Sequence, residues 1–127
     1  MNGYFENIEK VTLKNNYFRK VLFTGKHAQL VVMSLKPGEE IGLEVHKGVD
    51  QFFRFEQGEA TVVIDGKEFR VSPDDVIIVP AGSLHNITNT TSTDLKLYTI
   101  YSPPNHPDGT LHKTKKEAEE YEKSHHD

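Results

Sequence analysis

Short runs of β-branched and aromatic residues follow one another along most of this chain, and they constrain its fold more than any other feature. Each run is bounded by Gly, Pro, Asn, Asp or other turn-forming residues. This pattern is typical of antiparallel strands in a sandwich or barrel. We therefore expect an all-β fold, with strands at residues 17–24, 29–35, 40–45, 51–56, 60–64, 67–71, 75–79, 85–89 and 95–102.

The strongest local signal is the dipeptide Asp65-Gly66, which separates the runs 60–64 and 67–71. Asp-Gly supplies the two positive-φ positions of a type I′ turn. We expect a tight hairpin at this point.

The two ends of the chain differ from its middle. Residues 1–16 carry few apolar anchors, and we expect this lead segment along the outside of the fold or at a sheet edge. Residues 103–127 begin with a proline-rich stretch that cannot continue a strand, followed by a charged segment that predicts a short helix over 115–123. Thr114 and Glu117 have the spacing of a helix capping box. The chain is long enough for one domain, which we place at 17–102.

Polar side chains interrupt the apolar pattern at two places in the expected strands. Alternate residues of a strand share a face, so Glu44 and His46 project together. Gln51 alternates with Phe53 and should point inward, as should His85. Two imidazoles and a carboxylate facing one interior form a ligand set for a divalent metal ion, with the Gln51 amide oxygen as a fourth ligand. The plainer alternative is a pair of strand histidines bonded to their neighbours, but buried polar groups are costly without a partner such as a metal.

The order and spacing of these residues resemble the two motifs of the cupin family. Those motifs are a glycine-led His-x-His…Glu…Gly segment and a later Pro-x-Gly-x-x-His…Asn segment. The corresponding positions here are Gly38, Glu44, His46, Gln51, Gly58, Pro80, Gly82, His85 and Asn89. Glu44 stands in place of the first His and Gln51 in place of the Glu, so the single carboxylate moves but is kept. The second motif opens with Asp74 instead of Gly.

This resemblance implies a double-stranded β-helix, or jelly-roll, barrel that holds one divalent metal ion per chain, with Mn, Fe, Zn and Ni all open. It implies a metal-dependent enzyme of one of two kinds. One isomerises a sugar or sugar phosphate, and the other uses oxygen to cleave or oxidise a small organic acid or aromatic. The alternatives are a barrel that binds a small ligand without turnover and a scaffold with a vestigial site. The expected inward positions show no cluster of Lys or Arg, which disfavours a phosphorylated substrate.

Composition excludes several other functions. The chain has no Cys, and no Gly-x-Ser-x-Gly motif, so neither thiolate chemistry nor a serine nucleophile is available. A net charge of -4 without a basic stripe argues against a nucleic-acid partner. The N-terminal residues lack the apolar core of a signal peptide, and the apolar run 76–79 is too short to cross a bilayer. We expect a cytoplasmic protein with no membrane partner.

Two further expectations concern the surface. The segment 17–23 is rich in aromatic and branched residues and has no proline, and as an unpaired edge strand it favours a homodimer with this edge in the contact. We expect His27, His106 and His112 to face solvent. Among them, His106 is the one that a strap across the barrel mouth could bring to a ligand.

Overall fold

A computed structural model describes residues 2–125 of the chain. In chain order, the elements within this range are α1 (Ile8–Lys14), β1 (Arg19–Thr24), β2 (Gln29–Leu35), β3 (Asp50–Gln57), β4 (Ala60–Ile64), β5 (Lys67–Val71), β6 (Val76–Val79), β7 (His85–Asn89), β8 (Leu95–Ser102), β9 (Leu111–His112) and α2 (Lys115–His125). Residue 1 of the expected lead segment and residues 126–127 of the expected C-terminal segment lie outside the described residues.

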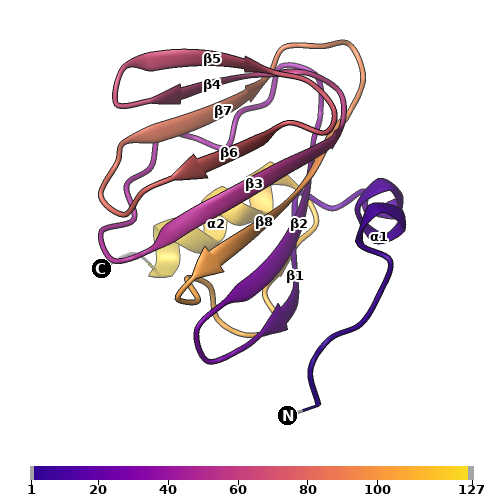
Figure 1. The fold of residues 1–127 in the computed structure, drawn as a ribbon, viewed down its shortest axis with the longest axis vertical. Coiled ribbons are helices and arrows are strands. Elements are labelled where there is room, and N and C mark those ends of the chain that lie inside the picture. Colours follow the sequence, from indigo (N-terminus) through magenta and orange to yellow (C-terminus); the bar gives the residue numbers. More distant parts are fainter. Residues whose placement is uncertain (1, 126–127) are drawn as a thin grey trace.

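The strands form two antiparallel sheets that enclose one core. The larger sheet has the order β6-β3-β8-β2-β1-β9, and the smaller has the order β5-β4-β7. Figure 1 shows β5, β4 and β7 side by side, and β3, β8, β2 and β1 side by side. The expected all-β jelly-roll with a short C-terminal helix is confirmed.

Alternation along the strands decides which side chains enter the core. On β3, every second residue from Gln51 is buried, whereas Arg54 between Phe53 and Phe55 is only partly covered. The inward residues of β3 lie opposite inward residues of β8, and the buried positions of β8 in this register are Tyr101, Thr99 and Leu97. Each fully buried aromatic or aliphatic side chain stabilises the fold by about 1.5–3 kcal/mol. This double row therefore supplies much of the stability of the barrel.

The Asp65-Gly66 turn has the expected conformation. Asp65 has φ 49° and Gly66 has φ 82°, as a type I′ turn requires. A second turn, after β3, requires glycine for lack of space. Gly58 has φ 84°, and a Cβ there would lie 3.1 Å from the Asp94 carbonyl oxygen. The hairpin expected between β4 and β5 is confirmed.

The segment 40–45 was expected as a strand, and this expectation was wrong for most of its length. Gly42 has φ 110°, which breaks the extended conformation. Only two isolated bridges remain, from Glu40 to Thr88 and from Glu44 to His85. They nevertheless hold the segment along β7, as an interrupted continuation of the smaller sheet.

The lead segment contains a helix that the sequence did not predict. The Asn7 side chain caps α1 by accepting a hydrogen bond from the Lys10 amide at 3.0 Å. The helix packs against β8, β3 and β2, and Lys96 Nζ on β8 donates to the Asn15 carbonyl at 2.6 Å. A helix this short is marginal in isolation, so the sheet beneath it stabilises it. Sequence pattern alone could not reveal that support.

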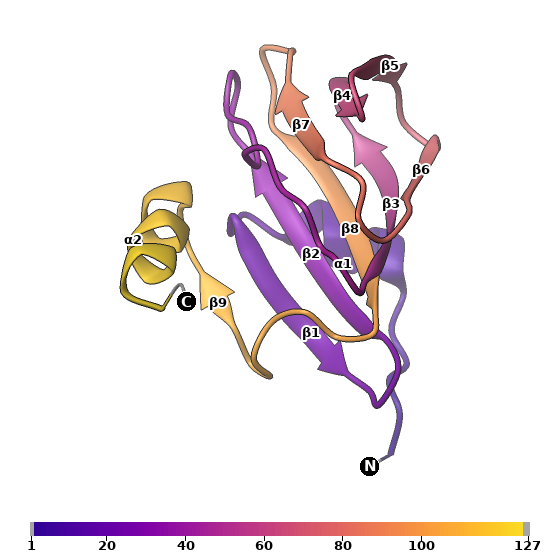
Figure 2. The same cartoon turned by 90° about the vertical axis from the view of Figure 1, so that its left-hand side faces the viewer.

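The C-terminal segment returns to the larger sheet before it forms α2. Leu111 and His112 of β9 pair with Lys20 and Arg19 of β1. Figure 2 shows β9 beside β1, with α2 beyond it. The amide of Glu117 donates to Thr114 Oγ1 at 3.1 Å, so Thr114 caps the helix as expected. None of the helices within residues 2–125 is long and apolar enough to cross a membrane.

This arrangement corrects the reason given for a homodimer. The edge of β1 is not free at its start, because β9 covers it within the same chain, and the Val21 amide donates to the Thr110 carbonyl at 2.9 Å. The other edge strand of the larger sheet is β6, which exposes Val76 and Ile78. The homodimer stays a prediction. Light scattering tests it against the monomer mass of 14.4 kDa.

Candidate metal centre

Glu44 and His85 face each other because their backbones pair directly. The Glu44 amide donates to the His85 carbonyl at 2.8 Å, and the His85 amide donates to the Glu44 carbonyl at 2.9 Å. Side chains of such a pair project to the same face. A carboxylate and an imidazole are thus fixed side by side by two backbone hydrogen bonds.

His46 joins this pair from two residues further along the chain. Its carbonyl accepts a hydrogen bond from the Gly82 amide at 2.9 Å, which ties the segment to the turn that precedes β7. Gly82 has φ 87°, a conformation that L side chains rarely adopt. The glycine of the second motif therefore helps to hold the first motif in place.

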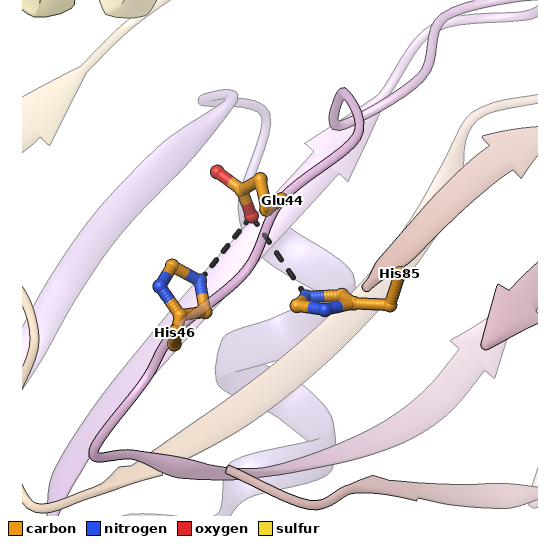
Figure 3. Close-up of side chains that lie close together, drawn as sticks. All are labelled: Glu44, His46 and His85. Atoms are coloured by element: carbon orange, nitrogen blue, oxygen red, sulfur yellow. Dashed lines mark ion pairs between the residues drawn. The ribbon is translucent and has the colours of Figure 1, made fainter. Parts of the chain in front are cut away.

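Glu44, His46 and His85 converge on one point, as Figure 3 shows. Glu44 Oε1 lies 3.4 Å from His46 Nε2 and 4.0 Å from His85 Nε2. One ligand atom from each of the three residues lies within 4.8 Å of the others. A metal ion at about 2.0–2.2 Å from each ligand places neighbouring ligand atoms about 3.0–3.5 Å apart. The Glu44–His46 separation lies within that range, and the Glu44–His85 separation is wider, at 4.0 Å.

The hydrogen bonds behind the ligand atoms also suit a metal. His85 Nδ1 donates to the Ser83 carbonyl oxygen at 3.1 Å. This bond selects the tautomer in which Nε2 carries the free electron pair, and Nε2 is the atom that points to Glu44. Metal-ligating histidines commonly have such a partner on their second nitrogen.

Three buried polar atoms in this region have no hydrogen-bond partner among the described residues. They are His46 Nε2, His85 Nε2 and Gln51 Oε1. Buried polar atoms without a partner are costly, and they are rare in native proteins. A divalent cation would satisfy the two imidazole nitrogens beside the Glu44 carboxylate, since imidazole nitrogens and carboxylate oxygens are ordinary ligands for Mn, Fe, Zn and Ni. The residues present thus fit a metal ion.

Gln51 enters from the other sheet. It is 2% exposed on β3, opposite Tyr101 of β8. Its amide nitrogen donates to Thr99 Oγ1 at 3.0 Å, which leaves the carbonyl oxygen Oε1 for another partner. The Tyr101 ring lies 5.8 Å from the His46 ring, edge to face, so Gln51 and the trio border the same aromatic ring. The expected inward orientation of Gln51 is confirmed.

The structure also brings in residues that the sequence analysis missed. Arg19, at the start of β1, is 2% exposed, although we found no inward cation from the sequence. Alternation with Val21, also buried, would have revealed it.

His112, expected at the surface, is 6% exposed, with its Nδ1 3.3 Å from Arg19 Nη1. Burial lowers the pKa of His112, and the charge of Arg19 lowers it further. Only His27 of the three expected surface histidines is fully exposed.

His106 comes from the strap to the barrel interior. Its Nε2 lies 3.1 Å from the Tyr101 hydroxyl oxygen, and the two rings meet edge to face at 5.0 Å. Burial, together with the nearby charges of Arg19 and the other histidines, lowers the pKa of His106 to about 3. Burial likewise raises the pKa of the Tyr101 phenol, so the hydroxyl keeps its proton and shares a hydrogen bond with a neutral His106.

Comparison with known proteins identifies the family of this fold. Residues 31–101, more than half of the chain, match the model of the cupin domain family. The chain belongs to the cupin family.

Three relatives illustrate its position. The uncharacterized protein YrkC of Bacillus subtilis is 53% identical over 118 residues, which are 88% of this chain and 63% of that protein. The crystal structure of BH2720 from Bacillus halodurans has a TM-score of 0.91 at 44% identity and covers 92% of this chain and 93% of its own. The oxalate-binding protein of Thermotoga maritima is 32% identical over 68 residues, 54% of this chain and 56% of that protein. The chain thus spans less than two thirds of the two curated relatives.

Proposed function

We propose that this protein is a metal-dependent enzyme that acts on a small organic molecule. Glu44, His46 and His85 would hold one divalent ion, with Gln51 Oε1 as the fourth ligand. The observation that carries the proposal is the set of three buried ligand atoms without a hydrogen-bond partner among residues 2–125. They come from three separate segments, and the Glu44 carboxylate lies beside two of them, 3.4 Å from His46 Nε2 and 4.0 Å from His85 Nε2, at distances too long for ordinary hydrogen bonds.

The chemistry follows from the ligand set. A bound divalent ion supplies a Lewis acid, and with three or four protein ligands it keeps coordination positions for water and substrate. Two imidazoles and one carboxylate leave a net positive charge at the centre, which attracts an oxygen-rich ligand. The side chains of Glu44 and His46 are 22% and 15% exposed, whereas His85 is almost fully buried. A substrate would therefore approach from the side of Glu44 and His46.

Two reaction classes suit such a centre. The ion would polarise a carbonyl or hydroxyl oxygen during isomerisation of a sugar, or support oxygen-dependent cleavage or oxidation of a small organic acid. The relative named as oxalate-binding supports the organic acid over the sugar. Tyr101 and His106 lie beside the site, since the Tyr101 ring is 5.8 Å from the His46 ring and its hydroxyl is 3.1 Å from His106 Nε2.

The second candidate is a barrel that binds the same kind of molecule without turning it over. The name of the Thermotoga maritima relative, which states binding only, favours this reading. The two candidates share the metal ligands and differ only in whether the bound molecule reacts.

The test compares metal-loaded protein, metal-free protein and the His85→Ala variant on a panel of small organic acids and free sugars. Oxygen uptake reports the oxidative reactions, and NMR reports the interconversion of aldoses and ketoses. We expect turnover in the metal-loaded wild type alone, with His27→Ala as the matched control that keeps it. Stoichiometric metal and ligand binding without turnover of any compound would favour the binding role instead.

A further inference from the structure

Arg19 places a permanent positive charge inside the barrel. It is 2% exposed, and it lies opposite Met33, itself 1% exposed, in the register of β1 and β2. Lys20, the next residue of β1, faces solvent instead. The guanidinium therefore belongs to the inward face of the larger sheet.

The contacts of Arg19 do not neutralise this charge. Nη1 lies 3.3 Å from His112 Nδ1, and Cζ lies 5.3 Å from the centre of the Phe18 ring. Nε is buried and has no hydrogen-bond partner, and no carboxylate among residues 2–125 comes within 4.0 Å of the guanidinium. The partners of Arg19 are thus the Phe18 ring, the His112 imidazole and the Tyr101 hydroxyl, whose pKa a hydrogen bond from Arg19 lowers, and none of them is a carboxylate.

Stability alone does not account for such a residue. A buried cation loses its hydration, and it recovers that loss only through an ion pair with good geometry. Lys96, the other buried cation among the described residues, is satisfied by the Asn15 carbonyl and by Asn16 Oδ1 at 2.9 Å. Arg19 is left with a free Nε donor and with no negatively charged partner. A free, buried guanidinium is the arrangement expected of a site that waits for an anion.

Tyr101 connects Arg19 to the metal centre. Apart from burial, which has the largest effect, the positive charge of Arg19 lowers the pKa of the Tyr101 phenol and the negative charge of Glu44 raises it. The phenol is therefore within electrostatic reach of both groups. The same phenol contacts His106, whose pKa also responds to Arg19 and to His46. The Tyr101 ring also lies 5.8 Å from the ring of His46, so Arg19 and a metal ligand border the same buried side chain.

We propose that Arg19 binds a carboxylate of the substrate while another oxygen of the same molecule meets the metal centre. This proposal rests on the proposed function and names its substrate class, a small carboxylic acid. A planar guanidinium matches a carboxylate through two parallel hydrogen bonds. A single free cation matches the single charge of a carboxylate, whereas a phosphate dianion would need more. Tyr101 supplies an additional hydroxyl beside the bound group.

The experiment is a calorimetric titration of the metal-loaded protein with glycolate and with glycolamide, which has the same size and no charge. Arg19→Gln is compared with wild type and with Arg70→Gln, a control that removes an exposed arginine from β5. We expect glycolate to bind Arg19→Gln about 10- to 100-fold more weakly than wild type, as for a lost charge-assisted hydrogen-bond pair. Glycolamide binding and the Arg70→Gln variant should be unchanged. Equal glycolate affinity in Arg19→Gln and wild type, or no preference of wild type for glycolate, would overturn the proposal. So would a preference for inorganic phosphate over glycolate.

Two controls separate this inference from the metal proposal and from a structural role. Metal content of Arg19→Gln should equal that of wild type. If wild type holds no metal, the metal proposal fails, and the same titration of metal-free protein still tests Arg19. Without ligand, Arg19→Gln and Arg19→Met should melt at the wild-type temperature or above it, since an unpaired buried charge is removed. Failure of both variants to fold would show that Arg19 serves only the structure, and the proposal would be wrong.

Discussion

The two ends of β7 each carry a buried polar side chain, and the two side chains differ in how fully they are hydrogen-bonded. At one end, all the hydrogen-bonding capacity of Asn89 is used. Its Nδ2 donates to the Leu35 carbonyl at 3.0 Å and to the Thr93 carbonyl at 2.8 Å, and its Oδ1 accepts from the Thr91 amide at 2.9 Å and the Thr91 hydroxyl at 2.8 Å. At the other end, His85 Nε2 has no partner. Both residues are almost completely buried.

This difference separates two tasks within one strand. A buried amide with four hydrogen bonds locks three chain segments together, so Asn89 serves the fold. A buried imidazole with one nitrogen anchored and the other open reduces stability unless a ligand binds. Both residues belong to the second motif of the family, yet only the open one marks the candidate site.

The largest effect that this comparison predicts is on stability at the Asn89 end. Asn89→Ala should lower the free energy of unfolding by about 2–4 kcal/mol, because it leaves the buried Leu35 carbonyl and the part-buried Thr91 amide without this partner and removes one of the two donors to the Thr93 carbonyl. Metal stoichiometry should not change. Urea unfolding measures the loss, and Asn105→Ala, at an exposed position, is the control. A loss no larger than that of the control would show that the hydrogen bonds of Asn89 do not stabilise the fold.

Next in size is the effect of metal on the melting temperature. An ion that binds only the folded state stabilises it by about 2.7 kcal/mol at 100 times its dissociation constant, a shift on the order of 10 °C for a chain of this size. Chelation should remove this shift and leave a folded apo barrel, because the core rests on apolar strands. Thermal melts with and without chelator measure it. A melting temperature that changes with neither chelator nor added Mn²⁺, Fe²⁺ or Zn²⁺ would contradict the assignment of His85 as a metal ligand.

Acid should lower the stability of the folded protein through His106, which contacts Tyr101. The pKa of His106 is lowered to about 3 in the folded protein by burial, from about 6.5 when unfolded. Between these values the unfolded chain binds a proton that the folded chain does not, so stability is fully present above about pH 6.5 and declines as pH falls toward 3. The contribution is at most about 1.4 kcal/mol per pH unit. His106→Gln should flatten this part of the stability profile relative to His27→Gln, and equal slopes in both variants would refute the role of His106.

The smallest effect concerns Asp74, at the same end of the barrel as Asn89. Asp74 has φ 77°, a conformation that favours glycine, and its carboxylate accepts a hydrogen bond from Arg54 Nη2 at 2.9 Å. Asp74→Gly should change the free energy of unfolding by less than about 1 kcal/mol, because relief of backbone strain offsets the loss of an exposed ion pair. A loss above about 2 kcal/mol would show that the carboxylate has a structural role.

Much of this fold could be predicted from local chemistry. The hairpin at Asp65-Gly66 and the inward face of β3 follow from turn preference and strand alternation, which depend on neighbouring residues alone. The positive φ of Asp74 explains why glycine stands at that point in the family motif. Helix α1 and strand β9 could not be predicted, because each is stabilised by the sheet on which it packs.

The candidate site divides in the same way. Glu44 and His46 are linked by spacing, and their pairing with His85 was suggested by the order of the motifs. Arg19 and His112 depend on the pairing of β1 with β9, residues far apart in the chain. Their burial has no local signature beyond the alternation at Arg19. Tertiary pairing, rather than composition, therefore decides which charged residues reach the interior.

The most direct test of the metal centre is the metal content of protein purified without metal-chelate chromatography. After incubation with Mn²⁺, Fe²⁺, Zn²⁺ or Ni²⁺, we expect about one equivalent of one of these ions per wild-type chain, and the same in His27→Ala. His46→Ala and His85→Ala should retain none, Glu44→Ala nearly none, and Gln51→Ala an intermediate amount, since a neutral amide is the weakest of the four ligands. Full occupancy in His46→Ala, or no ion in the wild type under any of these conditions, would contradict the assignment of Glu44, His46 and His85 as a metal centre.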